Sequence, residues 1–297
     1  MNKLLIVGGG LIGSSIARAA RDVAETVVVA DRDPDARAAL RRLGIADDVV
    51  ESGDGHADAD LAVLCVPPGA MAAAAELFVP GMRPGSILTD VGSLKGQVSG
   101  AVAPLVPAGV HWIPGHPIAG TEFSGPEAGF RELFEGRWVV LTPPPDADPV
   151  AVERLSGFWR ALGSEVEVMD AERHDLVLAA TSHVPHLIAF TLVGTATDLE
   201  EVTRGEVVKY SAGGFRDFTR IAASDPVLWT DVMLGNKEAV LEVVERVVED
   251  LSALKRAIRW DDAETVEARF RAASDLRRRI VDAGQDEPGF GRSARNT

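Results

Sequence analysis

The sequence of 297 residues predicts an α/β fold with a doubly wound parallel sheet, followed by an all-α domain. First, residues 3 to 142 alternate short β-branched runs with Ala- and Arg-rich amphipathic stretches, as βαβ units do. Second, a glycine motif from Gly8 to Gly13 separates the first such run from the first helical stretch. Third, the chain changes after Asp170 to 3.6-residue periodicity, with little alternation of period two.

The β-branched runs place the strands of the amino-terminal domain, which we expect to span residues 1–170. The expected strands are Leu4–Val7, Thr26–Ala30, Leu61–Val66, Ser86–Asp90, Trp138–Leu141 and Glu165–Met169. Pro143, Pro144 and Pro145 break regular structure, and a helix is expected from about Val150 to Leu162.

The aliphatic stripes of the carboxy-terminal half predict a helical domain over residues 171–284. The clearest stripes lie within residues 187–193 and 240–251. They carry more apolar surface than one small bundle buries, so we expect a homodimer that forms through this domain. Residues 285–297 have no periodicity and are expected to form a loose tail.

Charge and composition exclude several classes of partner. Thirty basic against forty-five acidic residues give a net charge of −15, which disfavours nucleic acid and anionic membranes. The single cysteine, Cys65, lies in an apolar run and is expected to be a small buried hydrophobe. The run Leu4–Val7 comes too early for a signal peptide. No uninterrupted apolar stretch approaches the roughly 18 residues of a membrane span, so we expect a cytoplasmic protein.

The glycine motif predicts a Rossmann-type dinucleotide site, with a glycine-rich structural turn as the alternative. Gly8 allows the tight turn, Gly10 lets the backbone approach a pyrophosphate, and Gly13 lets helix and strand pack closely. Asp31 directly follows the second expected strand, near the position at which an acid binds the adenine ribose, and favours NAD. NADP stays open because the guanidinium groups of Arg32 and Arg37 can accept a phosphate. The expected cofactor-binding residues are Gly8, Gly10, Leu11, Ile12, Gly13, Asp31, Arg32, Val66 and Pro67.

Three segments combine polar side chains with loop-forming residues and predict a reacting site. The segment from His116 to Gly125 joins a titratable imidazole to Gly, Pro, Thr and Ser, so His116 is a candidate proton acceptor. The segment Asp90–Gly96 follows an expected strand at the edge where such sheets bind ligands; the structural alternative is a helix N-cap by Ser93. The third contains His183 and His186, for which a metal pair is a further interpretation, although no nearby Cys or acidic cluster completes it.

Together these segments resemble one enzyme family. The joint occurrence of DVGSLKG, GHPIAGTEFSG, TSHVPH and GFRDFTRIAASDP resembles the prephenate/arogenate (cyclohexadienyl) dehydrogenases of tyrosine biosynthesis. The resemblance runs from the glycine motif to about Lys255. It implies an oxidoreductase that decarboxylates prephenate and/or arogenate with NAD(P), giving 4-hydroxyphenylpyruvate and/or tyrosine. Which of the two substrates is preferred stays open.

The resemblance also implies roles for individual residues. His116 would be the base and Ser93 would bind the ring hydroxyl or orient His116. Arg220 would bind the ring carboxylate, with an exposed helix charge as the alternative. His186 would contact the substrate side chain, whereas His183 is open between this role and a buried structural histidine. The remaining substrate-side residues are Thr121, Glu122, Asp217, Gly213 and Trp229.

Several alternatives to these roles stay open. Asp217 can equally pair with Arg216 or Arg220, and Trp229 can belong to a core or a dimer interface. No metal is required by the reaction. A relative acting on 4-amino-4-deoxyprephenate is a second enzymatic interpretation, which the intact His116 disfavours because an amine needs less help from a base. A catalytically silent NAD-binding sensor is the non-enzymatic one.

Overall fold

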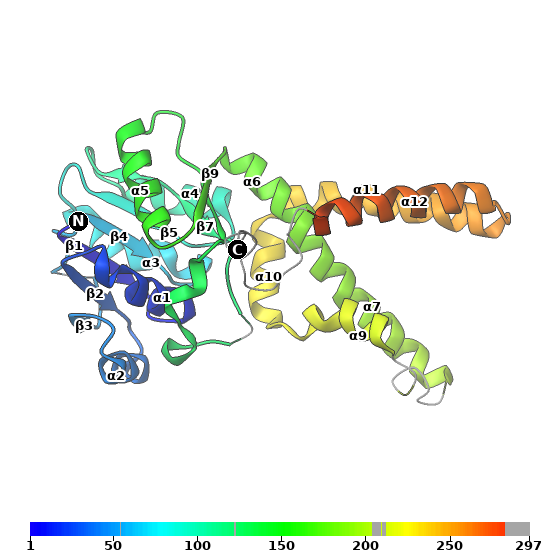
Figure 1. Cartoon of the computed structure of the whole chain (residues 1–297), viewed down its shortest axis with the longest axis horizontal. Coiled ribbons are helices and arrows are strands. Elements are labelled where there is room, and N and C mark those ends of the chain that lie inside the picture. Colours follow the sequence, from blue (N-terminus) through cyan, green and yellow to red (C-terminus); the bar gives the residue numbers. More distant parts are fainter. Residues whose placement is uncertain (54, 122, 204–208, 210–211, 283–297) are drawn as a thin grey trace, which may run out of the picture. The chain divides into compact units, whose positions relative to one another are not determined.

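A six-stranded parallel sheet organises the amino-terminal half of the chain. The computed structural model describes residues 1–282 except 54, 122, 204–208 and 210–211. The sheet consists of β1 (Lys3–Val7), β2 (Thr26–Ala30), β3 (Asp48–Val50), β4 (Leu61–Leu64), β5 (Ile87–Asp90) and β6 (His111–Trp112). Neighbouring strands run parallel in the order β3-β2-β1-β4-β5-β6 (Figure 1). The expected doubly wound α/β fold is confirmed, and the strand order reverses at β1/β4, where such folds bind ligands.

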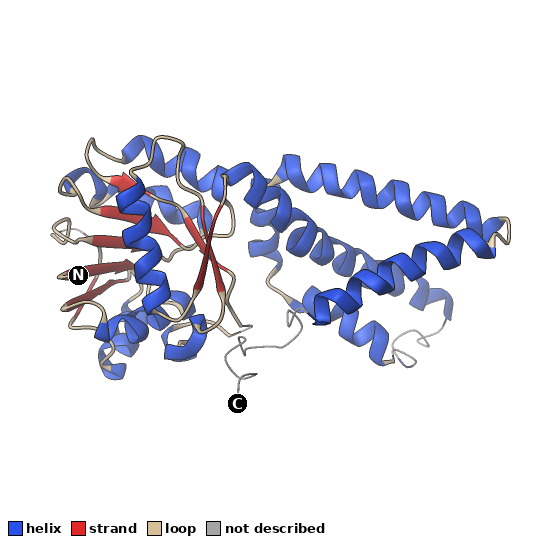
Figure 2. Ribbon diagram, turned by 45° about the horizontal axis from the view of Figure 1, so that its top comes forward, coloured by secondary structure: helices blue, strands red, loops and turns tan. Residues whose placement is uncertain are grey.

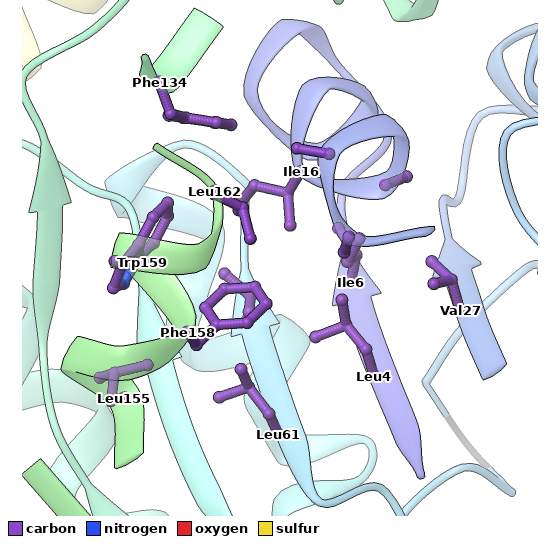
Figure 3. Close-up of a cluster of buried hydrophobic side chains, with 14 of the residues drawn as sticks. Leu4, Ile6, Ile16, Val27, Leu61, Phe134, Leu155, Phe158, Trp159 and Leu162 are labelled. Carbon is purple, nitrogen blue, oxygen red and sulfur yellow. The ribbon is translucent and has the colours of Figure 1, made fainter. Parts of the chain in front are cut away.

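Helices cover both faces of this sheet (Figure 2). They are α1 (Leu11–Ala19), α2 (Pro34–Leu43), α3 (Met71–Glu76), α4 (Lys95–Val102) and α5 (Pro149–Ala161). On one face, α1 and α5 pack Ile16, Leu155, Phe158 and Trp159 on Leu4, Ile6 and Leu61 (Figure 3). On the other, Met71, Val98 and Val102 pack on Leu5, Leu64 and Leu88. The strands are therefore buried on both sides, which explains their nearly continuous aliphatic sequences.

A separate three-stranded sheet follows, and the sequence analysis did not predict its first strand. It consists of β7 (Gly115–Pro117), β8 (Trp138–Leu141) and β9 (Glu165–Val168), with β7 antiparallel to β8 and β9 parallel to it. His116 was expected in a loop but lies on β7, opposite Val140. Strands of two or three residues, such as β3, β6 and β7, are too short to show alternation in the sequence. The expected strand Leu61–Val66 ends earlier, at Leu64.

The carboxy-terminal part is helical, as expected. Its helices are α6 (Ala171–Leu178), α7 (Val184–Thr203), α9 (Gly213–Thr219), α10 (Pro226–Gly235), α11 (Lys237–Arg259) and α12 (Ala263–Asp282). A π-helical turn, Ala179–His183, joins α6 to α7, and a 3₁₀ turn, Arg220–Ala223, follows α9. The described residues divide into two compact units, one holding those up to His174 and residues 256–282, the other Asp175–Lys255. The domain limits expected after residues 170 and 284 stay a proposal.

The unit Asp175–Lys255 buries little of its apolar surface. Its buried core consists of Ala179, Val184 and Val240, with partly buried side chains such as Ile188 and Met233 around it. Large apolar side chains that remain exposed include Leu192, Phe218, Val227, Leu234, Leu241, Val248 and Leu251. By length and composition alone, one described helical stretch, Ala171–Asp198, with a mean hydropathy of 1.7, is apolar enough to cross a membrane. One such helix is weak support for a membrane span, because core helices of other proteins have the same composition.

Candidate active site

A cavity of about 440 Å³ lies at the carboxyl ends of β1, β2 and β4. Six of the residues expected to bind a cofactor line it: Gly8, Gly10, Asp31, Arg32, Val66 and Pro67. The cavity wall also includes Glu51, Ser52 and Gly53. The three other expected residues, Leu11, Ile12 and Gly13, belong to the first turn of α1 and do not line this cavity.

The glycine motif leaves open space at the start of α1. Gly8 has a positive φ of 105°, and a side chain there would collide with the carbonyl of Cys65. A side chain at Gly13 would overlap the carbonyl oxygen of Gly8, so Gly13 permits the close approach of helix and strand. Gly10 is the N-cap of α1 without a side-chain cap, and nothing lies within 4 Å of where its Cβ would be. The helix N-terminus therefore offers room and N–H groups for an anion.

The carboxylate of Asp31 is held by two backbone groups at the end of β2. Its Oδ2 accepts the N–H of Gly9 at 2.7 Å and its Oδ1 accepts that of Asp33 at 2.9 Å. Arg37 donates to the carbonyls of Asp31 and Arg32, both at 2.8 Å. Arg37 is thus engaged by the backbone, which leaves the exposed Arg32 as the cation of this cavity able to meet a phosphate. This arrangement favours a ribose with free hydroxyls, as in NAD.

His116 forms a histidine pair that the sequence analysis did not predict. Its Nδ1 lies 2.9 Å from Nε2 of His174, a residue of α6 with no exposed surface. The two rings meet edge to face, with centroids 5.2 Å apart and an interplanar angle of 70°. If His116 is to accept a proton at Nε2, its Nδ1–H donates to His174. In this tautomer the hydrogen bond to His174 holds the orientation of the His116 ring.

Ser93 lies in the turn between β5 and α4, within a segment closed by a buried ion pair. Lys95 and Asp90 are both fully buried and in contact through Nζ and Oδ2. Asp90 also accepts the N–H of Gly92 at 2.9 Å and that of Gly115 at 3.1 Å, and Lys95 donates to the carbonyl of Gly115. The N-cap of α4 is Leu94, without a side-chain hydrogen bond, so the N-cap alternative for Ser93 is wrong.

Thr121 and Phe123, which follow β7, are exposed. Thr121 accepts the N–H of Phe123 at 3.3 Å, which is the geometry of a local turn. Glu122, expected beside it on the substrate side, lies outside the described residues. Cys65 directly follows β4 and is half-buried at the wall of the cavity; desolvation of its thiol, reinforced by the charge of Asp90, raises its pKa. Cys65 is therefore an unreactive thiol rather than a nucleophile.

In the helical unit, His186 and Trp229 form a stacked pair. The ring centroids are 3.5 Å apart at an interplanar angle of 18°. Nδ1 of His186 lies 2.8 Å from the carbonyl oxygen of Ser182 and must donate to it, because a carbonyl only accepts. Burial lowers the pKa of His186, with the hydrogen bond to Ser182 opposing the shift. The neutral ring therefore carries its lone pair on Nε2.

His183 is buried and hydrogen-bonded, which matches the structural alternative. Its Nδ1 lies 3.1 Å from the side-chain amide of Asn236, which also donates to the carbonyl of Asp175 at 2.8 Å. His183 is only 1% exposed. Among the described residues no group of three or more His, Cys, Asp or Glu is placed to hold a metal.

The last expected residues lie on or beside α9. Gly213 begins α9, and Arg220 begins the 3₁₀ turn after it. Arg220 is exposed, and within the described ranges no ion pair of its guanidinium is found. Asp217 pairs with Arg216 at 3.3 Å rather than with Arg220. An exposed arginine without an acidic partner is suited to an anionic ligand.

Comparisons with known proteins agree with this arrangement. The family model described as prephenate dehydrogenase, nucleotide-binding domain, matches residues 16–168, and the one described as its dimerization domain matches residues 170–272. The chain belongs to the prephenate dehydrogenase family. Its membership confirms the resemblance drawn from the four sequence segments.

Three relatives in this family illustrate the similarity. The chain is 39% identical to cyclohexadienyl dehydrogenase of Zymomonas mobilis, over 92% of this chain and 94% of that one. It is 32% identical to prephenate dehydrogenase of Bacillus subtilis, over 92% and 75%. The crystal structure of prephenate dehydrogenase from Aquifex aeolicus, in complex with hydroxyphenyl propionate and NAD+, is 33% identical, with a TM-score of 0.88 over 94% and 98%.

The sequence did not predict that three further residues, His174, Asp90 and Lys95, are buried beside the candidate site. His174 follows Arg173 in a charged stretch, which gave no sign of its burial. Asp90 and Lys95 flank Ser93 in a segment that was singled out, but charged residues beside a turn are usually exposed. The available sign for Lys95 was its position, directly after the apolar Leu94 and three residues before the apolar Val98. This spacing indicates that Lys95 points inward.

Proposed function

We propose that this protein oxidatively decarboxylates prephenate, arogenate or both, with NAD as cofactor. The observation that carries the proposal is the His116–His174 pair, in which Nε2 of His174 lies where it can accept the Nδ1–H of His116, so that the lone pair of His116 is on Nε2. Membership of the prephenate dehydrogenase family supports the reaction class. The products would be 4-hydroxyphenylpyruvate, tyrosine or both.

The residues of the 440 Å³ cavity fit NAD. Open space at Gly10 and the N-terminus of α1 suit a pyrophosphate, and Asp31 is oriented to accept hydrogen bonds from ribose hydroxyls. Val66 and Pro67 form an apolar part of the cavity wall just after β4. When bound, NAD supplies the hydride acceptor.

His116 acts as the base in this proposal. As the ring carbon that bears the hydroxyl is oxidised, the hydroxyl oxygen must lose its proton, and Nε2 of His116 takes it. The resulting imidazolium donates its Nδ1–H to the neutral ring of His174, which stabilises the positive charge. Ser93, in the turn after β5, would bind the same hydroxyl or orient His116.

The carboxylates and side chain of the substrate need cations and hydrogen-bonding groups. Arg220 is proposed to bind the ring carboxylate through its planar guanidinium. The His186–Trp229 pair is proposed to contact the substrate side chain. The secondary contacts that we propose are Thr121, Glu122, Asp217 and Gly213. For Asp217, the substrate would have to compete with Arg216, with which Asp217 forms an ion pair.

The exposed apolar residues of the helical unit support a homodimer. Leu234, Leu241, Val248 and Leu251 lie on α10 and α11, inside the range matched by the dimerization-domain model. A second copy of the chain would cover them. If the second copy also covers exposed residues of Ala171–Asp198 such as Leu192, the apolar character of that stretch needs no membrane, in keeping with the proposed cytoplasmic location.

Four initial-rate assays at 340 nm test the proposal, crossing prephenate and arogenate with NAD and NADP. We expect reduction of NAD with at least one substrate and slower reduction of NADP. The amino-substituted substrate, 4-amino-4-deoxyprephenate, serves as a fifth assay. Activity with this substrate alone would overturn the proposed substrate, and inactivity with all three would favour an NAD-binding sensor.

A further inference from the structure

The fully buried ion pair between Asp90 and Lys95 forms hydrogen bonds with Gly115, the residue that precedes His116. Both side chains have no exposed surface. Asp90 Oδ1 accepts the N–H of Gly115, and Lys95 Nζ donates to the carbonyl of the same residue. One ion pair therefore holds both backbone polar groups of Gly115.

The same pair closes the turn that carries Ser93. Asp90 is the last residue of β5, and Lys95 is the first residue of α4. Asp90 Oδ2 also accepts the N–H of Gly92, inside this turn. Ser93 lies in the turn after β5 of the six-stranded sheet, whereas His116 lies on β7 of the three-stranded sheet. The contacts of the ion pair with Gly115 join these two segments.

Stability alone is a poor reason for this arrangement. Removing two charges from water costs several kcal/mol each, and apolar side chains of similar size often stabilise a protein equally well. A buried pair whose hydrogen bonds converge on one glycine instead selects a single geometry. A displacement of about 1 Å in a reacting group can lower a rate about 10²-fold.

We propose that Asp90 and Lys95 are positioning residues that set the placement of His116 relative to Ser93. The inference rests on the proposed function, in which His116 is the base. Because the pair is neutral as a whole, it fixes geometry without adding net charge beside the imidazole. Among the described residues, the titratable groups near this junction include His174, which contacts His116, and the thiol of Cys65, which is near Asp90.

Two single variants test the pair, because each removes one partner and leaves the other, oppositely charged, partner in place. Lys95→Met leaves the carboxylate of Asp90 beside β7 and should raise the pKa of His116, seen in the pH profile of kcat. Asp90→Asn leaves the ammonium of Lys95 and should lower that pKa. In both variants kcat should fall about 10²-fold while KM for NAD changes little.

A neutral double variant, Asp90→Asn with Lys95→Met, separates geometry from charge and guards against misfolding of the single variants. It should return the pKa of His116 to the wild-type value but leave kcat about 10²-fold low. Lys3→Met is the matched control, because Lys3 forms a more exposed ion pair with Asp58 at 2.6 Å. It should retain wild-type kcat. Thermal unfolding and NAD binding confirm that each variant is folded.

The outcomes distinguish failure of this inference from failure of the proposed function. If the folded double variant keeps wild-type kcat while His116→Asn is impaired, the ion pair is structural and the inference is wrong. Shifts of the pKa in the same direction in both single variants would also overturn it. If the wild-type protein reduces no NAD with any of the substrates, the proposed function itself fails.

Discussion

Replacing His174 with Phe tests whether the buried ring tunes His116. The substitution removes the acceptor that lies 2.9 Å from Nδ1 of His116, and a ring of similar size fills the fully buried site. The nearest conservative variant, His174→Gln, keeps an acceptor in its side-chain oxygen. His111→Gln is the matched control, because His111 is a partly exposed histidine on β6 whose nearest ionic partner is Asp148 at 4.0 Å.

The magnitude follows from the difference between two hydrogen bonds. A hydrogen bond between neutral groups contributes about 0.5–1.5 kcal/mol, and one to a charged group contributes about 1.5–3 kcal/mol. Only the difference, about 1–1.5 kcal/mol, helps the step in which His116 becomes charged. It corresponds to about a 5- to 12-fold fall in kcat. The same difference should lower the pKa of His116 by about 1 unit.

Steady-state rates at 340 nm over a range of pH measure both effects. In His174→Phe the rise of kcat with pH should move to lower pH, because the imidazolium has lost its acceptor. His174→Gln should recover most of the rate, and His111→Gln should match the wild type. If folded His174→Phe keeps the wild-type kcat and pH profile, the pair does not tune the base.

Four further predictions concern residues already described. His116→Asn should lower kcat by about 10²–10⁴-fold with substrate binding retained, and unchanged turnover would remove His116 as the base. Arg220→Gln should raise KM by about 10- to 160-fold, because a charge-assisted contact of about 1.5–3 kcal/mol is lost; an unchanged KM would place the carboxylate elsewhere. Asp31→Asn should lower the preference for NAD over NADP about tenfold, since a like-charge repulsion of about 1.4 kcal/mol disappears, and equal preference in both proteins would contradict this. The neutral His186 can accept a hydrogen bond from the amino group of arogenate, and its pKa lies below the usual 6.5. Protonation of His186 removes this acceptor, so the ratio of kcat/KM for prephenate to that for arogenate should rise only below about pH 6.5. A constant ratio down to about pH 5 would be evidence against this contact.

The sequence predicted the parts of the site that depend on local chemistry. The turn at Gly8, the close packing at Gly13 and the acid at Asp31 are each required by a neighbouring residue or by the strand in which they lie. Such requirements leave a recognisable spacing. The doubly wound sheet was predicted for a similar reason, because the buried strands β1, β2 and β4 are nearly continuous aliphatic runs.

The second sheet was missed because its first strand is defined by a distant partner. Gly115–Pro117 contains a glycine and a proline, neither of which favours a strand. It is extended because it pairs with Val139–Leu141 on β8. No local pattern carries that information, so His116 was assigned to a loop.

The residues that contact His116 and Gly115 were not predicted, for a related reason. His116 and Ser93 were singled out because their segments combine polar with loop-forming residues, and the resemblance to a family then gave them roles, whereas the contacts of His174, Asp90 and Lys95 exist only in the folded chain. A charged or titratable side chain in a polar stretch is normally solvated, so the sequence favours exposure for all three. Their complete burial is tolerated because each meets a polar partner: His174 the ring of His116, and Asp90 and Lys95 one another and Gly115. Both sets of contacts converge on two consecutive residues of β7. The cost of burying three polar side chains is therefore concentrated where a small displacement would matter most for proton transfer.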